Sequence, residues 1–270
     1  MKKTAIGIAA LAALLATPAL AADLYRPAPI YKAPPAAVPA AYSWTGFYIG
    51  LNGGYGWNQS TGDSYCITPG GVLNGVGCDT PNTGVVKPGG GLFGGQAGYN
   101  LQSGSIVYGL ETDIQWSGIK GSGSAIDLCC NPAAVPLGTF SASSKLDWFG
   151  TARGRFGVLA SSNALLYATG GLIYGRESVS NVLTFPLVSY PASATTTRAG
   201  WTVGGGLEFA FTGNLSGKIE GLYYDMGSVT DAFTSPLTGY TEGAKYNFTG
   251  GIIRAGLNYH FGGGPVVTRY

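Results

Sequence analysis

Apolar and polar side chains alternate with a period of two over long stretches of this chain. In the stretch 250–261, one parity is mostly apolar, whereas the other holds, apart from Ile252, small or polar residues and one arginine, Arg254. The apolar parity contains Ile253, Ala255, Leu257, Tyr259 and Phe261. Because successive side chains of a β-strand point to opposite faces, this pattern predicts a strand with one apolar face.

Seven further segments carry the same pattern. They are 44–58, 91–101, 106–116, 146–158, 164–179, 200–211 and 215–225. The alternation in 164–179 is less strict, and the register of that strand stays open. The segments are about 10–15 residues long, against ~5–6 for strands of soluble sheets and ~9–11 for a tilted strand that crosses a bilayer. Their length therefore favours membrane-crossing strands.

The connections between these segments alternate in length. Short polar turns ("QSG", "ASSN" and "TGN") alternate with four long stretches, at 58–90, 117–145, 180–198 and 226–245. Outer-membrane barrels have short periplasmic turns and longer extracellular loops, whereas a soluble β-sandwich has no reason for such alternation. We therefore predict an all-β fold: an eight-stranded antiparallel transmembrane β-barrel of the cell outer membrane, with long extracellular loops.

Closure explains why the chain would form a barrel. An open sheet edge in hydrocarbon leaves backbone N–H and C=O groups unsatisfied, and a closed cylinder has no edge. Aromatic residues at segment ends are expected to form girdles at the two membrane interfaces. The expected girdle residues are Trp44, Trp57, Trp116, Tyr259 and Phe261.

The two ends of the chain differ from the barrel region. Residues 1–21 begin with Lys2 and Lys3, continue with a short apolar run and end in "ALA", as a secretory signal peptide does. Residues 22–43 are rich in Pro and Ala and are expected to form an extended periplasmic linker. The barrel is expected over 44–261, followed by a C-terminal tail at 262–270.

The charge balance excludes a nucleic-acid binder. Of 15 Lys and Arg residues, two lie in the signal segment, which leaves 13 cations against 13 Asp and Glu residues. A nucleic-acid binder needs a basic face. Only 10% of residues are charged, against ~25% in typical soluble proteins. This low fraction fits strands that turn apolar residues toward lipid.

Alternation also assigns charged side chains to the barrel interior. The residues expected to face the lumen are Glu111, Asp113, Asp147, Arg153, Arg155, Glu208, Lys218, Glu220 and Arg254. A charge on the lipid face costs about 2–4 kcal/mol at the midplane for Lys or Arg, so their shared parity predicts an interior network of ion pairs. Glu220, on the neighbouring strand, is the first choice of partner for Arg254.

The cysteines leave several pairings open. An exported protein meets an oxidising compartment, and the simplest expectation is a disulfide between Cys66 and Cys78 within the first long loop. Adjacent Cys129 and Cys130 form a vicinal bridge, pair across loops or stay reduced. The spacing of the cysteines fits no metal motif, and we expect neither a metal nor a cofactor.

The sequence gives little support to an enzyme. The single histidine, His260, falls at the periplasmic end of the last strand, and we expect no base beside a nucleophile, as covalent catalysis requires. Glu111 and Asp113 lie on the face that carries the arginines, so charge pairing is the simpler interpretation of these carboxylates.

Several motifs resemble a known family. "SWTGFYIGLNGGYGW" after a Pro/Ala linker, "YGLETDIQWSGIKG", "DWFGTARGRFGV", "GWTVGGGLEFAF", "KIEGLYYDMGS" and "IIRAGLNYHF" are similar to those of small alpha-proteobacterial outer-membrane β-barrel proteins. These are the porin-family or outer-membrane immunogenic proteins, akin to OmpA-like barrels. The resemblance implies assembly by the barrel-assembly machinery, which reads an aromatic terminal strand; either Phe261 or Tyr270 would supply that aromatic residue.

The expected function is structural. Eight strands enclose an interior about wide enough to be filled by side chains, whereas open pores have ~16–18 strands. We expect a surface barrel that stabilises the outer membrane; the alternative is a narrow porin-like channel for small solutes. Expected partners are outer-membrane lipid and lipopolysaccharide, periplasmic chaperones, and surface ligands such as phage, antibodies or host surfaces that contact the long loops.

Overall fold

The alternating segments pair with one another in the computed structural model of the chain. It describes residues 42–58, 63–68, 71–72, 86–127, 138–184, 186–234 and 241–262. These residues form eleven strands in one antiparallel sheet. Among them, no helix is long and apolar enough to cross a membrane.

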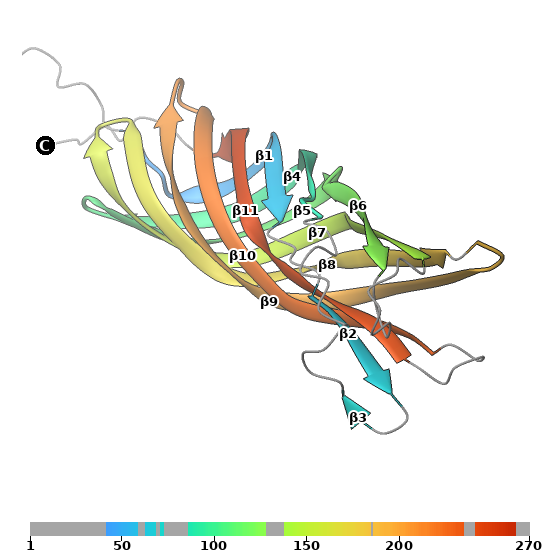
Figure 1. Ribbon diagram of the computed structural model, residues 1–270. Helices are drawn as coiled ribbons and strands as arrows, with labels where there is room; N and C mark the ends of the chain where they lie inside the picture. The colour runs from blue at the N-terminus through green and yellow to red at the C-terminus, as the bar shows by residue number, and fades with distance from the viewer. Residues whose placement is uncertain are drawn as a thin grey trace, which may run out of the picture. The chain divides into compact units, whose positions relative to one another are not determined.

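A closed ring of antiparallel pairings runs through eight of the strands. In ring order they are β1 (Gly46–Asn58), β4 (Gly89–Ser103), β5 (Ile106–Ser117), β7 (Gly138–Ser161), β8 (Ala164–Thr184), β9 (Ser189–Ala210), β10 (Leu215–Thr234) and β11 (Thr241–Phe261). Pairing of β1 with β11, from Phe47 opposite Phe261 to Asn58 opposite Gly250, closes the cylinder (Figure 1). The predicted antiparallel β-barrel is therefore confirmed.

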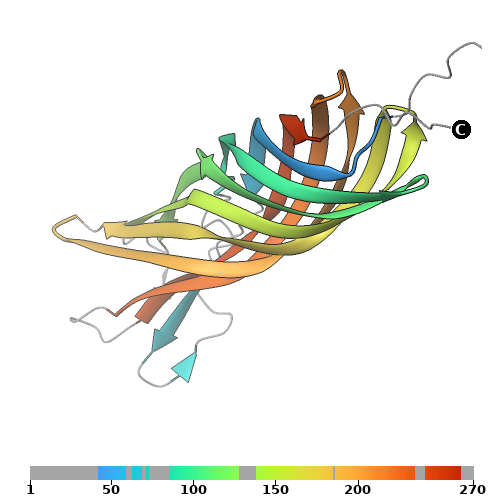
Figure 2. The ribbon, with the colours of Figure 1, turned by 180° about the vertical axis from the view of Figure 1, so that it is seen from behind.

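Three further strands extend the wall at one end. β6 (Lys120–Asp127) pairs with the first part of β7, and β2 (Asp63–Thr68) pairs with the first part of β11. β3 (Gly71–Val72) forms a short hairpin with β2. Figure 2 shows β6 to β9 from behind, where they continue past the end of β1.

The outer face carries the apolar parity of the ring strands. Exposed apolar residues run from Phe47, Tyr108 and Phe156 near one end to Trp57 and Trp116 near the other. At the second end, Trp116 and Trp148 are directly opposite each other on β5 and β7. The rings of Trp148 and Tyr174 lie 6.2 Å apart, and those of Trp201 and Tyr223 lie 5.5 Å apart. We call the aromatic residues at this second end the upper aromatic line; they are Trp57, Trp116, Trp148, Tyr174, Trp201 and Tyr223.

The short turns lie together at one end of the barrel. They occupy residues 104–105, 162–163 and 211–214, and the start of β1 and the end of β11 lie at the same end. Gly104 has φ +60°, a left-handed conformation that glycine adopts without a steric penalty. The chain therefore returns to this end after every second strand, and an even number of strands brings both ends of the barrel segment to the same side.

The long connections differ from the expectation. β8 and β9 remain paired up to Thr184 opposite Ser189, so most of the stretch 180–198 is strand. β10 and β11 likewise continue to Thr234 opposite Thr241, and β6 and β7 occupy much of 117–145. These stretches are rich in Ser, Thr and Val, and hydrogen bonding between strands satisfies their backbones. The expected long loops at 117–145, 180–198 and 226–245 are therefore replaced over much of their length by paired strands.

A charge cluster inside the barrel as the candidate functional site

Eight of the nine charged residues expected in the lumen come together in one buried cluster. Four are carboxylates and four are cations, so their formal charges cancel. They are Glu111, Asp113, Arg153, Arg155, Glu208, Lys218, Glu220 and Arg254. Their side chains are at most 3% exposed. They come from five of the ring strands, β5, β7, β9, β10 and β11, and we call them the charge cluster.

Two arginines connect three carboxylates across the lumen. Arg254 Nη2 lies 2.8 Å from Asp113 Oδ2 and 2.7 Å from Glu220 Oε1. Arg153 contacts Glu111, and its Nη2 and Nη1 lie 3.2 Å from Asp113 Oδ2 and 3.1 Å from Glu220 Oε2. Each carboxylate therefore faces more than one cation, which offsets the large cost of removing it from water.

Lys218 and Arg155 hold the part of the cluster nearest the short turns. Lys218 Nζ donates to both oxygens of Glu111 at 2.8 Å, although the two residues are on β10 and β5. Arg155 Nη2 donates to Glu208 Oε2 at 2.6 Å, and its guanidinium carbon lies 4.0 Å from the Tyr167 ring centroid. This arginine thus combines an ion pair with a cation–π contact.

Neutral donors complete the coordination of the carboxylates. The Tyr48 hydroxyl donates to Glu111 at 2.7 Å, the Tyr167 hydroxyl donates to Glu220 at 3.0 Å, and Thr151 donates to Asp113 at 2.7 Å. Beside them, a chain of amides crosses from β1 to β11. Asn52 donates to Gln96 at 2.9 Å, and Gln96 donates to Asn258 at 2.5 Å.

Two apolar clusters lie on either side of the charge cluster. Toward the short turns lie Tyr42, Trp44, Val107, Leu165, Tyr167 and Ala210. Toward the other end lie inward-facing residues that include Leu92, Ile119, Phe149, Ile173, Leu222 and Ile252. These apolar residues were not predicted, because alternation assigned the inward parity to small and polar side chains. Both clusters consist of buried residues, one on each side of the charge cluster.

Trp44 does not belong to an aromatic girdle, contrary to the prediction. It is fully buried inside the barrel, its ring 4.8 Å from Tyr42 and 5.9 Å from His260. The Tyr42 N–H donates to the Ser162 carbonyl in the β7–β8 turn, which lies across the ring from β1. The segment therefore crosses the barrel end. Trp44 has the parity of inward-facing Tyr48, so the sequence held a signal for this placement.

The other expected girdle residues lie on the outer face. Trp57, Trp116, Tyr259 and Phe261 are all exposed, with Trp57 and Trp116 at the end opposite Tyr259 and Phe261. A girdle of these four residues at the membrane interfaces stays a prediction.

Asp147 does not belong to the charge cluster, so its predicted place in the lumen network is wrong. It lies apart from the charge cluster and pairs with Lys145, Nζ to Oδ1 2.5 Å, while Ser178 donates to it at 2.8 Å. The pairing of β7 with β8 shifts register between Leu146 and Trp148, as at a β-bulge. An extra residue at a bulge reverses the parity of the strand on its far side, so alternation counted back from Thr151 assigns Asp147 to the wrong face.

A contact of His260 was also not predicted from the sequence. Ser216 Oγ lies 2.9 Å from His260 Nε2 and donates to Glu208 Oε1 at 2.6 Å. An imidazole therefore does lie beside a hydroxyl, contrary to expectation. Because the Ser216 hydroxyl donates its proton to Glu208, the imidazole Nε2–H must be the donor in the contact between His260 and Ser216. Both side chains are buried, and Glu208 approaches Nε2, not Nδ1, so the geometry is not that of a catalytic triad.

The expected disulfide lies outside the described side chains. Cys66 is in β2, where only the backbone is described, and Cys78, Cys129 and Cys130 lie outside the described residues. The segments 1–21 and 262–270, except Gly262, and nearly all of 22–43 also lie outside them.

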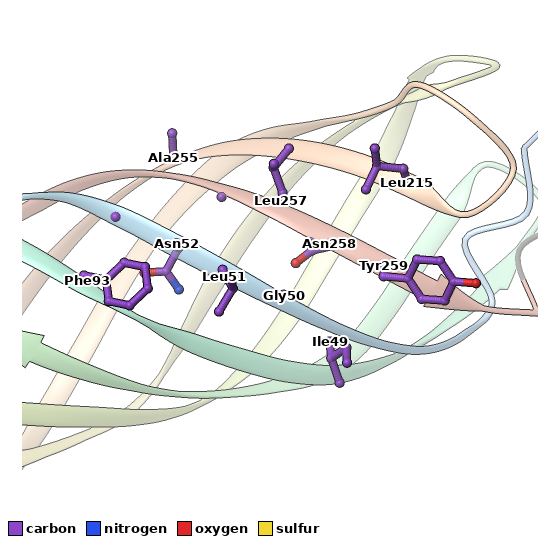
Figure 3. A pocket seen from close by; sticks show the side chains of 12 residues that line it. Ile49, Gly50, Leu51, Asn52, Phe93, Leu215, Ala255, Leu257, Asn258 and Tyr259 are labelled. Atoms are coloured by element: carbon purple, nitrogen blue, oxygen red, sulfur yellow. The ribbon is translucent and has the colours of Figure 1, made fainter.

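A shallow groove of about 590 Å³ runs along the outer face of β1 and β11. Figure 3 shows Ile49 and Leu51 from β1 beside Leu257 and Tyr259 from β11. These side chains are apolar and point away from the charge cluster, so the groove belongs to the apolar outer face.

The chain is similar to several outer-membrane proteins. Residues 7–261 match the family described as outer membrane protein beta-barrel domain. The 31 kDa outer-membrane immunogenic protein of Brucella melitensis is 35% identical over 228 residues, 79% of this chain and 83% of that protein. The 22 kDa outer membrane protein of Rhizobium leguminosarum is 32% identical over 187 residues, 68% of this chain and 65% of that protein. The outer membrane protein OprG from Pseudomonas aeruginosa, a solved structure, aligns with a TM-score of 0.47 at 10% identity, over 80% of this chain and 96% of that one.

Proposed function

Because this chain belongs to the outer membrane protein β-barrel family and lies in the outer membrane, we propose that it is a closed barrel with a structural and surface role. In this proposal, the lumen is filled by side chains and conducts no solute. The barrel anchors the strand extensions at the membrane, and the extensions present a polar surface outside it.

The observation that carries this proposal is the burial of the charge cluster between two apolar clusters. A solute that crossed the lumen would have to separate ion pairs whose partners are almost fully buried, such as Glu220 and Arg254. It would also have to displace Trp44 at one end and residues such as Phe149 at the other. Each step leaves buried charged or apolar groups without partners, which is costly.

The buried Ser216–His260 contact supports a structural role over catalysis. A nucleophile must reach its substrate, but both side chains are buried, and the Trp44 ring lies 5.9 Å from that of His260. Arg155, Ser216 and Asn258 all donate to Glu208, so this carboxylate serves as a hub of the interior network. We therefore propose no enzymatic activity.

The proposed partners follow from the membrane location. The aromatic Phe261 ends the last strand, as a strand read by the barrel-assembly machinery would. We propose that periplasmic chaperones deliver the chain, that outer-membrane lipid and lipopolysaccharide surround it, and that surface ligands contact the strand extensions beyond the upper aromatic line.

Liposome swelling tests the closed lumen. Vesicles that contain the purified protein should swell in an isotonic sugar no faster than vesicles without protein, while vesicles with an open porin swell rapidly. Swelling that increases with the amount of this protein and depends on the size of the sugar would instead establish a narrow channel.

A further inference from the structure

The outer face of the barrel changes character at the upper aromatic line on β5 to β8. Below the line, the exposed residues are apolar, as at Ile114 and Leu172. Beyond it, the outward side chains of β6, β7 and β8 are mainly hydroxyls and cations. The change occurs within one or two residue pairs, because Trp148 is directly opposite Arg176.

Three exposed cations lie at this boundary. Lys120 on β6 is directly opposite Lys145 on β7, and Lys145 is directly opposite Ser178 on β8, two residues beyond Arg176. Like charges directly opposite each other on neighbouring strands destabilise a sheet unless an anion lies between them. Asp147 lies 2.5 Å from Lys145 and also interacts electrostatically with Arg176, and one carboxylate against three cations leaves a net positive charge.

A groove lined by serines, together with Gly123, Ala142 and Val182, lies immediately beyond the cations. It has a volume of about 430 Å³ and runs across β6, β7 and β8. Five serines contribute to it: Ser122, Ser124, Ser141, Ser143 and Ser180. Hydroxyls at the opposed positions of three strands form a flat surface of donors and acceptors, which suits the hydroxyls of a sugar ring.

The boundary faces the outer leaflet if the short turns are periplasmic. The three short turns, the start of β1 and the end of β11 all lie at the end of the barrel opposite the groove. Short turns are periplasmic in outer-membrane barrels, so the cations lie at the height of the lipid headgroups of the external leaflet. The three cations therefore lie between the apolar outer surface on one side and the serine groove on the other.

The geometry points to a binding surface for the phosphorylated sugar headgroup of an outer-leaflet glycolipid. The phosphate lies among Lys120, Lys145 and Arg176, the sugar lies against the serine groove, and the acyl chains pack on the apolar face below Trp116 and Trp148. This inference deepens the surface role proposed above and rests on it, because it requires the strand extensions to lie outside the membrane.

Binding of bisphosphorylated lipid A in detergent tests this surface. The full protein is compared with a triple variant, Lys120→Gln, Lys145→Gln and Arg176→Gln, by thermophoresis. The triple variant should bind about 10- to 100-fold more weakly, since each basic residue near an anionic lipid surface contributes to attraction. The affinity of the full protein should also fall as salt rises, because exposed charges are screened.

A charge-conserving triple variant is the matched control. Lys120→Arg, Lys145→Arg and Arg176→Lys keep the positive charge and should retain binding of lipid A. All three proteins should migrate as folded barrels on unboiled gels, so that weaker binding cannot come from unfolding. Lipid A with its phosphates removed should bind all three proteins equally weakly.

Several results would overturn the inference. They are undiminished binding of lipid A by the glutamine variant, equal binding of phosphatidylglycerol, which would show a general anionic-lipid surface, and binding of inorganic phosphate as tight as that of lipid A. These results leave the closed lumen unaffected, because liposome swelling measures it separately.

Discussion

Glu220 and Arg254 are directly opposite each other on β10 and β11, and Arg254 Nε and Nη2 lie 2.9 and 2.7 Å from Glu220 Oε1. Both side chains are fully buried. Arg254 also contacts Asp113 at 2.8 Å, so the pair is one link in a larger network and not an isolated ion pair. The energetic consequences of breaking it therefore depend on the charges that remain.

Loss of both partners should destabilise the barrel less than the sum of the two single losses. Arg254→Ala leaves Glu220 and Asp113 short of a cation, and we expect a loss of about 3–5 kcal/mol in the free energy of unfolding. Glu220→Ala in the same chain should recover about 0.5–3 kcal/mol of the summed single losses. Urea unfolding in lipid vesicles measures all four proteins. Strict additivity would show that the two residues do not interact.

Two aspartates provide a matched comparison of buried and exposed pairs. Asp113→Asn removes a charge that contacts Arg153 and Arg254 inside the barrel and should cost about 3–5 kcal/mol. Asp147→Asn removes a partner of the half-exposed Lys145 and should change the free energy of unfolding by at most about 1 kcal/mol. Equal losses in denaturant titrations would place Asp147 in the interior network, contrary to its position here.

Trp44 should matter for stability more than an outer-face tryptophan. Trp44→Ala removes a fully buried ring that packs on Tyr42 and His260, and we expect a loss of about 3–5 kcal/mol. Trp116→Ala, at a position 66% exposed, should cost less. The temperature at which the folded band disappears on unboiled gels compares the two. A smaller shift for Trp44→Ala than for Trp116→Ala would mean that the segment does not close the barrel end.

Glu177 should make the stability of the strand extension depend on pH. It lies beyond the upper aromatic line, and neither of its buried carboxylate oxygens has a hydrogen-bond partner among the described residues. Burial raises the pKa of Glu177 from 4.5 to about 8, although nearby Arg198 acts to lower it. A raised carboxyl pKa means that the folded state favours the protonated form. The contribution of Glu177 to the stability of the β8–β9 extension is therefore fully present below pH 4.5 and is lost as the pH rises toward about 8.

Glu177→Gln tests this dependence. The variant keeps the shape of the protonated side chain but cannot ionise, so protease resistance of the β8–β9 hairpin should no longer fall over this pH range. A wild-type hairpin whose resistance is constant with pH, or rises toward pH 8, would contradict the assignment.

Alternation in the sequence predicted which face most residues occupy, but not which residues meet. It placed Glu111 and Lys218 inside the barrel, yet their contact joins β5 and β10 across the lumen, and parity has no information on distance across a cylinder. It failed at Asp147 because a bulge shifts the register, and bulges leave no periodic signal.

The strand extensions show a second limit of the sequence. Polar, Ser- and Thr-rich stretches such as 189–197 resemble loops in composition, yet β9 continues through them because β8 offers a paired edge. Pairing of this kind depends on the neighbouring strand and is not contained in the composition of either segment. The apolar cluster around Phe149 and Ile173 was missed for a related reason, since its residues have the parity of the lumen but not the expected polarity.

Current across a planar lipid bilayer tests the closed lumen most directly. With the purified wild-type protein inserted, we predict no stable unitary conductance, because we propose that the charge cluster and the two apolar clusters fill the lumen. Arg254→Ala should then introduce small currents if the network is what blocks ions. Reproducible unitary currents through the wild-type protein, unchanged by Arg254→Ala, would contradict a lumen closed by this cluster.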